Sequence, residues 1–302
     1  MPLAPAARIA LALVWWASAV GVSLSFSFVL PTLGSPLRSL AATAAVTSAM
    51  LALVGAGGAA LSREPLVQRL GLGPSTARTR TLLLLVAGFL GTSQALETVI
   101  ELCGLRDTGT LGEIDAALAG ASGFELAWAL LAIGVAPGIG EELFARGWIQ
   151  RGLAPLLGSR WAIVLGAAVF GVLHADPVHA PAAFALGLYL GAAVEATGGL
   201  RVAILCHVVN NLLAVTSAAL GGGDPGGVPL EPAVRAALGA LGALVGAGAL
   251  VVAYRGRPGP TDRAAALGPT DRAAALQNAG GAADQGRRGA EEPPTAGGGQ
   301  SP

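Results

Sequence analysis

Apolar runs long enough to cross a membrane as helices recur along this chain, and they limit its possible folds more than any other feature. A hydrocarbon layer about 30 Å thick needs about 20 apolar residues per helix. Charged residues make up 12% of the sequence, whereas a soluble domain has about 25%. The sequence therefore predicts an all-α, polytopic transmembrane helical bundle of about eight spans, with seven as the alternative count. The predicted spans lie near residues 9–30, 40–62, 81–104, 124–154, 161–175, 181–198, 201–220 and 232–254.

Three of these runs need comment. Those near 161–175 and 181–198 are short for a full crossing, so we expect tilted, broken or shielded helices there. The run near 9–30 also resembles a signal peptide, because Arg8 precedes it and the small residues 17–19 could form a cleavage site. We favour an uncleaved first span because the apolar run continues well beyond those small residues.

Arginine placement predicts the orientation of the spans, since all 18 basic residues are arginine. One set of inter-span segments carries most of them: Arg8, Arg63, Arg69, Arg78, Arg80, Arg151, Arg160, Arg201, Arg255 and Arg257. The opposite set holds Arg38 and Arg106 together with several acidic residues. The positive-inside rule then predicts a multi-pass protein of the cell membrane with both termini in the cytoplasm. The formal net charge of zero gives no indication of a nucleic-acid partner.

The adjacent pair Glu141-Glu142 lies in one of the apolar runs. Carboxylates at membrane depth are costly and rare, and they usually mark a functional site. Arg146 follows Glu142 by one helical turn, so these two side chains can form an ion pair. Glu141 is rotated about 100° from Glu142, which leaves its carboxylate available for proton chemistry. A purely structural ion pair is the alternative interpretation of Glu142 and Arg146.

Two later runs each contain a histidine with a partner one turn away. Phe170 could pack beside the imidazole of His174. His207 and Asn211 would share one helix face, and both can donate hydrogen bonds to an oxyanion. Asn211 could instead serve as an interhelical hydrogen-bonding residue. His179 lies in a D-P-V-H-A-P segment and is expected to be solvated.

A carboxylate, an imidazole and a pair of hydrogen-bond donors are the groups that a peptide hydrolase requires. His174, His207 and Glu141 would also form a plausible zinc ligand set with an open water position. Zn²⁺ therefore remains a possible cofactor at this stage. Cys103 and Cys206 match no paired-cysteine motif, so we expect neither a disulfide framework nor a cysteine-based zinc site.

Three segments, taken together, resemble the signature motifs of a known family. E-E-L-F-A-R at 141–146, F-G-V-L-H at 170–174 and H-V-V-N-N at 207–211 resemble the motifs E-E-x-x-x-R, F-x-x-x-H and H-x-x-x-N. These motifs belong to the CAAX-protease and bacteriocin-processing (CPBP) family of intramembrane peptidases, which are relatives of the type II CAAX prenyl endopeptidase. The resemblance covers about residues 124–220 and includes the order of the motifs.

The resemblance implies an all-helical fold and a role for each motif residue. Glu141 would be the general base that activates water, with His174 as its partner, and His207 and Asn211 would stabilise the oxyanion. The remaining motif residues, Glu142, Arg146 and Phe170, would support the site. Members of the family are commonly called metalloproteases, but a metal-independent glutamate mechanism is also proposed for them, so both mechanisms stay open here.

The expected organisation follows from the spans and the motifs. Residues 1–122 would form about three spans with their loops, and residues 123–220 the catalytic core. Residues 221–254 would form the last span, and residues 255–302 a disordered cytoplasmic tail that contains a nine-residue tandem repeat, G-P-T-D-R-A-A-A-L.

The expected activity is that of an endopeptidase acting on a protein or peptide associated with the lipid bilayer. Two alternatives remain: a transporter or proton-relay protein, because such proteins also use intramembrane Glu and His, and a non-catalytic immunity or scaffold protein with the same fold.

Counting along the helices predicts that the motif residues would not meet if every helix were straight. His207 is about 10 Å from Arg201, whereas Glu141 and His174 are about 20 Å or more from Arg160. We therefore expect tilted or broken helices, with the Pro-Gly-Ile-Gly stretch just before Glu141 as a site for a kink.

Overall fold

Helices account for the regular structure of the chain. The computed structural model describes residues 35–257 except 63, 74, 76 and 222–230, and it contains no strand among them. The predicted first span and the tandem repeat lie outside the described residues. Residues Met1–Arg255 and Gly256–Pro302 form separate units, and the account below concerns the first.

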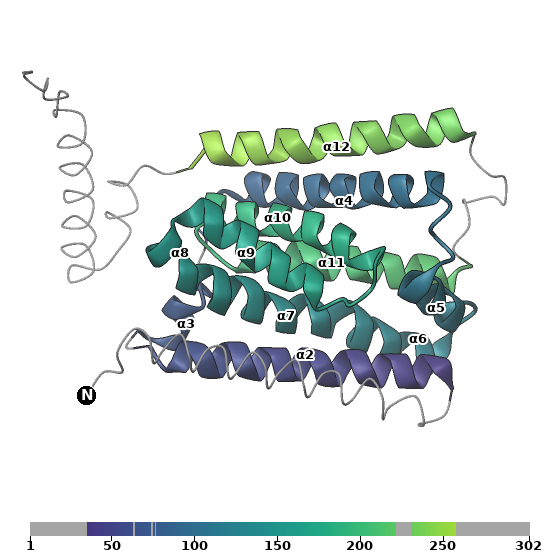
Figure 1. Cartoon of the computed structure of the whole chain (residues 1–302), viewed down its shortest axis with the longest axis horizontal. Helices are drawn as coiled ribbons and strands as arrows, with labels where there is room; N and C mark the ends of the chain where they lie inside the picture. The colour runs from purple at the N-terminus through teal and green to yellow at the C-terminus, as the bar shows by residue number, and fades with distance from the viewer. Residues whose placement is uncertain (1–34, 63, 74, 76, 222–230, 258–302) are drawn as a thin grey trace, which may run out of the picture. The chain divides into compact units, whose positions relative to one another are not determined.

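The described part of the chain confirms the predicted all-α transmembrane bundle (Figure 1). Six elements in it are long and apolar enough to cross a membrane: α2 (Pro36–Ala60), α4 (Thr79–Leu102), the continuous helix Gly123–Leu157, α10 (His179–Thr197), α11 (Arg201–Ala219) and α12 (Pro232–Arg255). The predicted span near 161–175 is the shorter α9 (Ser159–Val172). Two short helices join the spans: α3 (Leu66–Arg69) and α5 (Gly109–Leu118).

The continuous helix of 35 residues changes its winding along its length. Its successive parts are α6 (Gly123–Ala129), the π-helical η2 (Leu130–Val135), α7 (Ala136–Glu142), the π-helical η3 (Leu143–Gln150) and α8 (Arg151–Leu157). The interruption expected before Glu141 therefore takes the form of π-helical segments on both sides of the acidic pair. Such segments are rare and often occur at functional sites, and no feature of the sequence predicted them.

Glycines let α7 lie very close to its neighbours. It packs chiefly against α2 and α11. A Cβ atom on Gly140 would overlap the carbonyl oxygen of Ser48 in α2, and one on Gly138 would overlap Val208 in α11. Small residues at such crossings are how membrane helices approach one another without a hydrophobic driving force. The acidic pair is thus held on a helix with tightly packed neighbours.

The same packing recurs between α4 and α12, which lie side by side in Figure 1. The backbones of Gly91 and Gly242 meet there so closely that a Cβ atom on either would overlap the other's carbonyl oxygen. Elsewhere in the bundle, α9 packs against α10, and α10 in turn packs against α11. The described spans therefore surround α7 and α11, which carry most of the motif residues.

The two ends of the bundle differ in their polar contacts. At one end, arginines bind carbonyl groups: Arg151 Nε donates to Arg69 O (3.2 Å), and Arg201 Nε donates to Leu72 O (2.8 Å). At the other end, arginines pair with carboxylates: Arg38 with Glu125, Arg106 with Glu97 and Asp115, and Arg235 with Glu101. The arginine pattern of the sequence assigned most of these arginines to the same two ends. The predicted spans 81–104 and 232–254, however, placed Glu101 and Arg235 inside the membrane-crossing runs. Which end faces the cytoplasm stays a prediction.

Candidate active site

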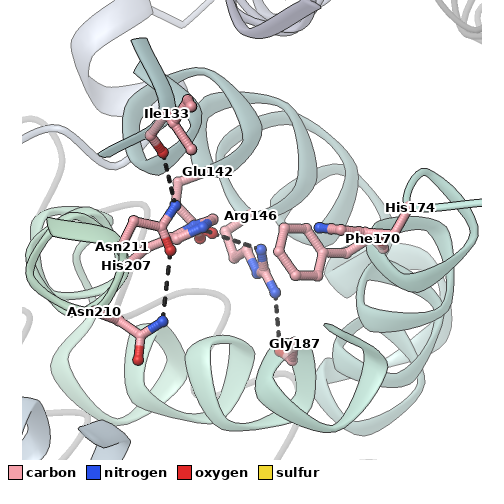
Figure 2. Close-up of polar contacts among 9 residues, drawn as sticks. All are labelled: Ile133, Glu142, Arg146, Phe170, His174, Gly187, His207, Asn210 and Asn211. Carbon is pink, nitrogen blue, oxygen red and sulfur yellow. Dashed lines mark hydrogen bonds and ion pairs between the residues drawn. The ribbon is translucent and has the colours of Figure 1, made fainter. Parts of the chain in front are cut away.

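Glu142 lies at the centre of a buried polar cluster. Its side chain and that of Arg146 are both fully buried. Arg146 Nη1 donates to Glu142 Oε1 at 2.7 Å, as the one-turn spacing predicts, and His207 Nδ1 donates to the same oxygen at 2.9 Å (Figure 2). Arg146 Nη2 also donates to the carbonyl of Gly187 in α10 at 3.1 Å. The cluster thus joins the helix of the acidic pair to α10 and α11.

Phe170 connects this cluster to the second motif. The Arg146 guanidinium lies over its ring, with Cζ 4.3 Å from the centroid. The rings of His207 and His174 meet the Phe170 ring at centroid distances of 5.7 and 5.0 Å. Figure 2 shows the Phe170 ring between Arg146 and His174. The face of an aromatic ring attracts cations, so Phe170 both packs the site and accommodates the buried guanidinium.

Glu141, the other carboxylate of the pair, faces a pocket. It lines a cavity of about 860 Å³ together with His174, His179 and residues of α2, α5 and α6. Its Oε2 atom is buried and makes no hydrogen bond within the described part of the chain. The two neighbouring carboxylates therefore occupy different surroundings, as their angular offset on the helix predicts.

His174 is held in one tautomer by its own helix. Its Nδ1 atom lies 2.9 Å from the carbonyl oxygen of Phe170. A carbonyl oxygen only accepts hydrogen bonds, so Nδ1 carries the proton, and Nε2 is the basic nitrogen of the neutral ring. The same reasoning applies to His207, whose Nδ1 donates to the carboxylate of Glu142. Each imidazole thus retains one nitrogen for chemistry.

His179 is not the solvated loop residue that the sequence suggested. It begins α10, lines the pocket with Glu141 and His174, and its ring lies 4.4 Å from that of His174, centroid to centroid. Asp176 holds it there, because Asp176 Oδ1 accepts hydrogen bonds from the backbone N–H groups of His179 (2.7 Å) and Val178 (2.9 Å). An acidic residue just ahead of an apolar run is a common helix-start signal, and it could have indicated this arrangement.

Asp176 also connects the pocket to α5. Its Oδ2 atom accepts a hydrogen bond from the backbone N–H of Thr110 at 3.0 Å. These backbone donors lower the pKa of Asp176 to about 2, because they stabilise the charged form. The turn that follows His174 is therefore tied to the start of α5, which also lines the pocket.

The Asn211 amide binds a backbone carbonyl of a neighbouring helix. Its Nδ2 donates to the carbonyl oxygen of Ile133 in η2 at 3.3 Å. In a regular helix that carbonyl would accept from residue 137, but Pro137 has no N–H. Asn211 thus satisfies a carbonyl that the proline leaves without its usual partner, and one of its two amide hydrogens is engaged there.

The helix counts explain which motif residues meet. Arg151 contacts Arg69 and Arg201 contacts Leu72, three residues farther along, so the two arginines mark a similar level of the bundle. Glu142 lies nine positions before Arg151 through the π-helical η3, and His207 lies six positions after Arg201, so each is about two helical turns from that level. The sequence predicted that the motif residues would lie at different depths because the position of Glu141 was counted from Arg160 and not from Arg151. His174 remains farther from that level, and it joins Glu141 at the pocket instead of joining His207.

The two histidines of the zinc set predicted from the sequence have different polar partners. His174 and His207 contact the same Phe170 ring but make separate polar contacts, one with a backbone carbonyl and the other with Glu142. Across the residues that the structure describes, no group of three or more His, Cys, Asp or Glu side chains is arranged to hold a metal ion. Cys103 and Cys206 are both free thiols.

One comparison with known proteins finds a family for the core of the chain. Residues 123–213 match the family model described as type II CAAX prenyl endopeptidase Rce1-like. The matched segment contains all three motifs and runs from the start of α6 into α11. No curated protein and no solved structure matches the chain.

Proposed function

We propose that this protein hydrolyses a peptide bond with water activated by Glu141, because residues 123–213 match the model of the type II CAAX prenyl endopeptidase Rce1-like family, a CPBP family of proteases. The family suggests intramembrane endopeptidase activity, and it implies a lipid bilayer and a protein or peptide substrate. The proposal goes further, by assigning the catalytic base and its partners.

One observation carries this assignment: two adjacent carboxylates are divided between a buried ion pair and a pocket. The charge of Glu142 is matched by Arg146 and hydrogen-bonded by His207. Glu141 has no such pairing within the described residues, and it lines the pocket beside His174. A general base needs a carboxylate that is free to take a proton, and because Glu142 is paired with Arg146 and His207, Glu141 is the better candidate.

In the proposed mechanism, a water molecule in the pocket gives a proton to the Glu141 carboxylate, while His174 Nε2 accepts a hydrogen bond from the same water. The water oxygen forms a bond to the carbonyl carbon of the substrate, and the carbonyl oxygen becomes an oxyanion. When the carbonyl re-forms, the C–N bond breaks, and the proton held by Glu141 passes to the departing amine. Water is thereby added across the peptide bond with no net change in Glu141.

For the oxyanion we retain His207 and Asn211 as the proposed donors. Asn211 has a second amide hydrogen besides the one engaged with Ile133. His207 has a second ring nitrogen, Nε2, that Glu142 does not engage, and an imidazolium donates from both nitrogens. Preorganised donors of this kind are worth about 10²–10³-fold in rate.

No step of the proposed mechanism is assigned to a metal ion. We expect activity to survive treatment with a zinc chelator. Elemental analysis of the purified protein checks this: stoichiometric zinc that is lost together with activity, and restores it when added back, would establish the metal mechanism instead.

The test of the proposal begins with comparison of protein termini in cells that contain either the wild-type protein or Glu141→Gln. Termini that depend on Glu141 identify the cleaved sequence, from which a fluorogenic peptide is made. With that peptide and purified protein in detergent, we expect Glu141→Gln and His174→Ala to lower kcat by about 10²–10⁴-fold, the usual contribution of a general base.

Glu113→Gln provides the matched control, because Glu113 is another carboxylate that lines the pocket. We expect this variant to keep its kcat. Full activity in folded Glu141→Gln protein would overturn the assignment of the base, and equal losses in Glu113→Gln would show a general effect of charge in the pocket.

A further inference from the structure

The His179 ring occupies a place that the proposed mechanism leaves without a role. It lines the same pocket as Glu141 and His174, and it meets the His174 ring edge-on, with 63° between the ring planes. No signature motif of the family includes this position. A second imidazole in contact with the partner of the base calls for a physical explanation.

The His174 ring is held by three contacts. Its Nδ1–H is bound to the carbonyl oxygen of Phe170, and the Phe170 ring packs against it at 65°. His179 supplies the third contact. The Nδ1 hydrogen bond alone allows the imidazole to rotate about that anchor, whereas contacts with two further rings restrict this rotation. The direction of Nε2 is therefore fixed by packing.

His179 is itself rigidly placed. The chain turns back on itself between the two histidines, with Ala175 in the left-handed region at φ 48°. Non-glycine residues rarely adopt this conformation, and it costs about 1–2 kcal/mol. Asp176 stabilises the turn by accepting hydrogen bonds from the N–H groups of Val178 and His179 and from that of Thr110 in α5. A strained turn that is tied at several points keeps the two rings together.

We infer that His179 is a positioning residue, whose ring contact holds the His174 imidazole with Nε2 directed at the water activated by Glu141. The inference rests on the proposed function. It implies that His179 acts on the chemical step and not on substrate affinity, because its contact is with His174. A misplacement of about 1 Å in a catalytic group can lower the rate by about 10²-fold.

The test compares three variants with the fluorogenic peptide described above. His179→Ala removes the ring, and we expect kcat to fall by about 10- to 100-fold with KM nearly unchanged. His179→Phe keeps an aromatic edge against His174 and should restore most of kcat. Val172→Ala, a change at an exposed residue of the neighbouring helix end, should resemble the wild type.

Each outcome has a distinct meaning. If His179→Ala keeps its kcat, or changes only KM, or if His179→Phe fails to restore turnover, the positioning role is wrong. If the His179→Ala protein does not survive purification, His179→Leu replaces it in the test, because leucine keeps most of the side-chain volume but has no ring. We expect His179→Leu to show the same fall in kcat. The proposed function fails separately, when wild-type protein does not cleave or when His174→Ala is fully active.

Discussion

At the scale of the residue, the chemistry of this site depends on which charges are matched. The Glu142–Arg146 pair is fully buried, and Arg146 makes further contacts with a carbonyl and an aromatic ring. Desolvating two charges consumes much of their attraction, so such a pair adds little net stability as a unit. Removing one partner is different, because the other charge is then left in an apolar interior.

We therefore predict that Arg146→Met destabilises the protein by about 3–5 kcal/mol, the usual result of leaving a buried charge unpaired. The double variant Glu142→Leu/Arg146→Met should recover part of this loss, because it removes both charges. Unfolding free energies in detergent or bicelles measure the effect, and the two changes should be strongly non-additive.

The exposed pair Arg38–Glu125 is the matched control, with side chains 68% and 46% exposed. Arg38→Met is expected to cost at most about 1 kcal/mol. If Arg146→Met proves equally mild, the buried cluster does not stabilise the fold in the way described.

At the scale of the element, the helix Gly123–Leu157 is the part of the molecule on which the site is built. Its π-helical segments flank α7, and Pro137 leaves the Ile133 carbonyl for Asn211. Its glycines bring the backbones of α2 and α11 close to the acidic pair. The element therefore sets the position of Glu141 through backbone packing as well as through side-chain contacts.

Gly140→Ala tests this packing. The added methyl group would overlap the Ser48 carbonyl oxygen in α2, and a backbone atom cannot move aside as a side chain can. We expect the free energy of unfolding to fall by about 1–3 kcal/mol. We also expect reduced cleavage, because α7 must move away from α2 and Glu141, the next residue of α7, moves with it. Thermal unfolding and the peptide assay provide the two measurements.

Gly57→Ala is the control on α2, since nothing lies within 4 Å of a Cβ atom at Gly57. Alanine is favoured over glycine within helices by about 1 kcal/mol, so this variant should be neutral or slightly more stable. Similar destabilisation in both variants would mean that the close approach of α2 and α7 has no special importance.

At the scale of the whole molecule, the pocket lies toward one end of the bundle. The side of the membrane that this end faces decides from which side a substrate reaches the pocket. Thr110 and Glu113 of α5 line the pocket, and α5 follows closely after Cys103 at the end of α4. The arginine pattern predicts that this end lies outside the cytoplasm. Cys103 is exposed and Cys206 is buried, so the two native thiols differ in accessibility.

We predict that a membrane-impermeant maleimide labels Cys103 when it is added to intact cells. Cys103→Ser should abolish the labelling, because the other thiol is buried within the bundle. Mass spectrometry of the purified protein locates the label. Labelling only after the membrane has been opened would reverse the predicted orientation and the side from which the pocket is reached.

Much of the candidate site was predictable from the sequence because its pairs are local. The ion pair of Glu142 with Arg146 and the packing of Phe170 on His174 each join residues one helical turn apart. Helix geometry alone brings such residues together. The assignment of His179 to a solvated loop was wrong because its contact with His174 depends on a tight turn with a rare backbone conformation.

By itself, the sequence determined that this protein is an all-α membrane bundle with the three motifs of a protease family, because hydropathy and motif spacing are properties of the linear chain. Only the tertiary structure decided that His207 donates a hydrogen bond to Glu142 and that Asn211 donates one to the Ile133 carbonyl. It also decided that Glu141 shares a pocket with His174. These contacts join separate helices, whose rotation, depth and winding follow from packing against one another. No local pattern specifies those quantities, which is why the two neighbouring carboxylates could be told apart by environment only in the folded molecule.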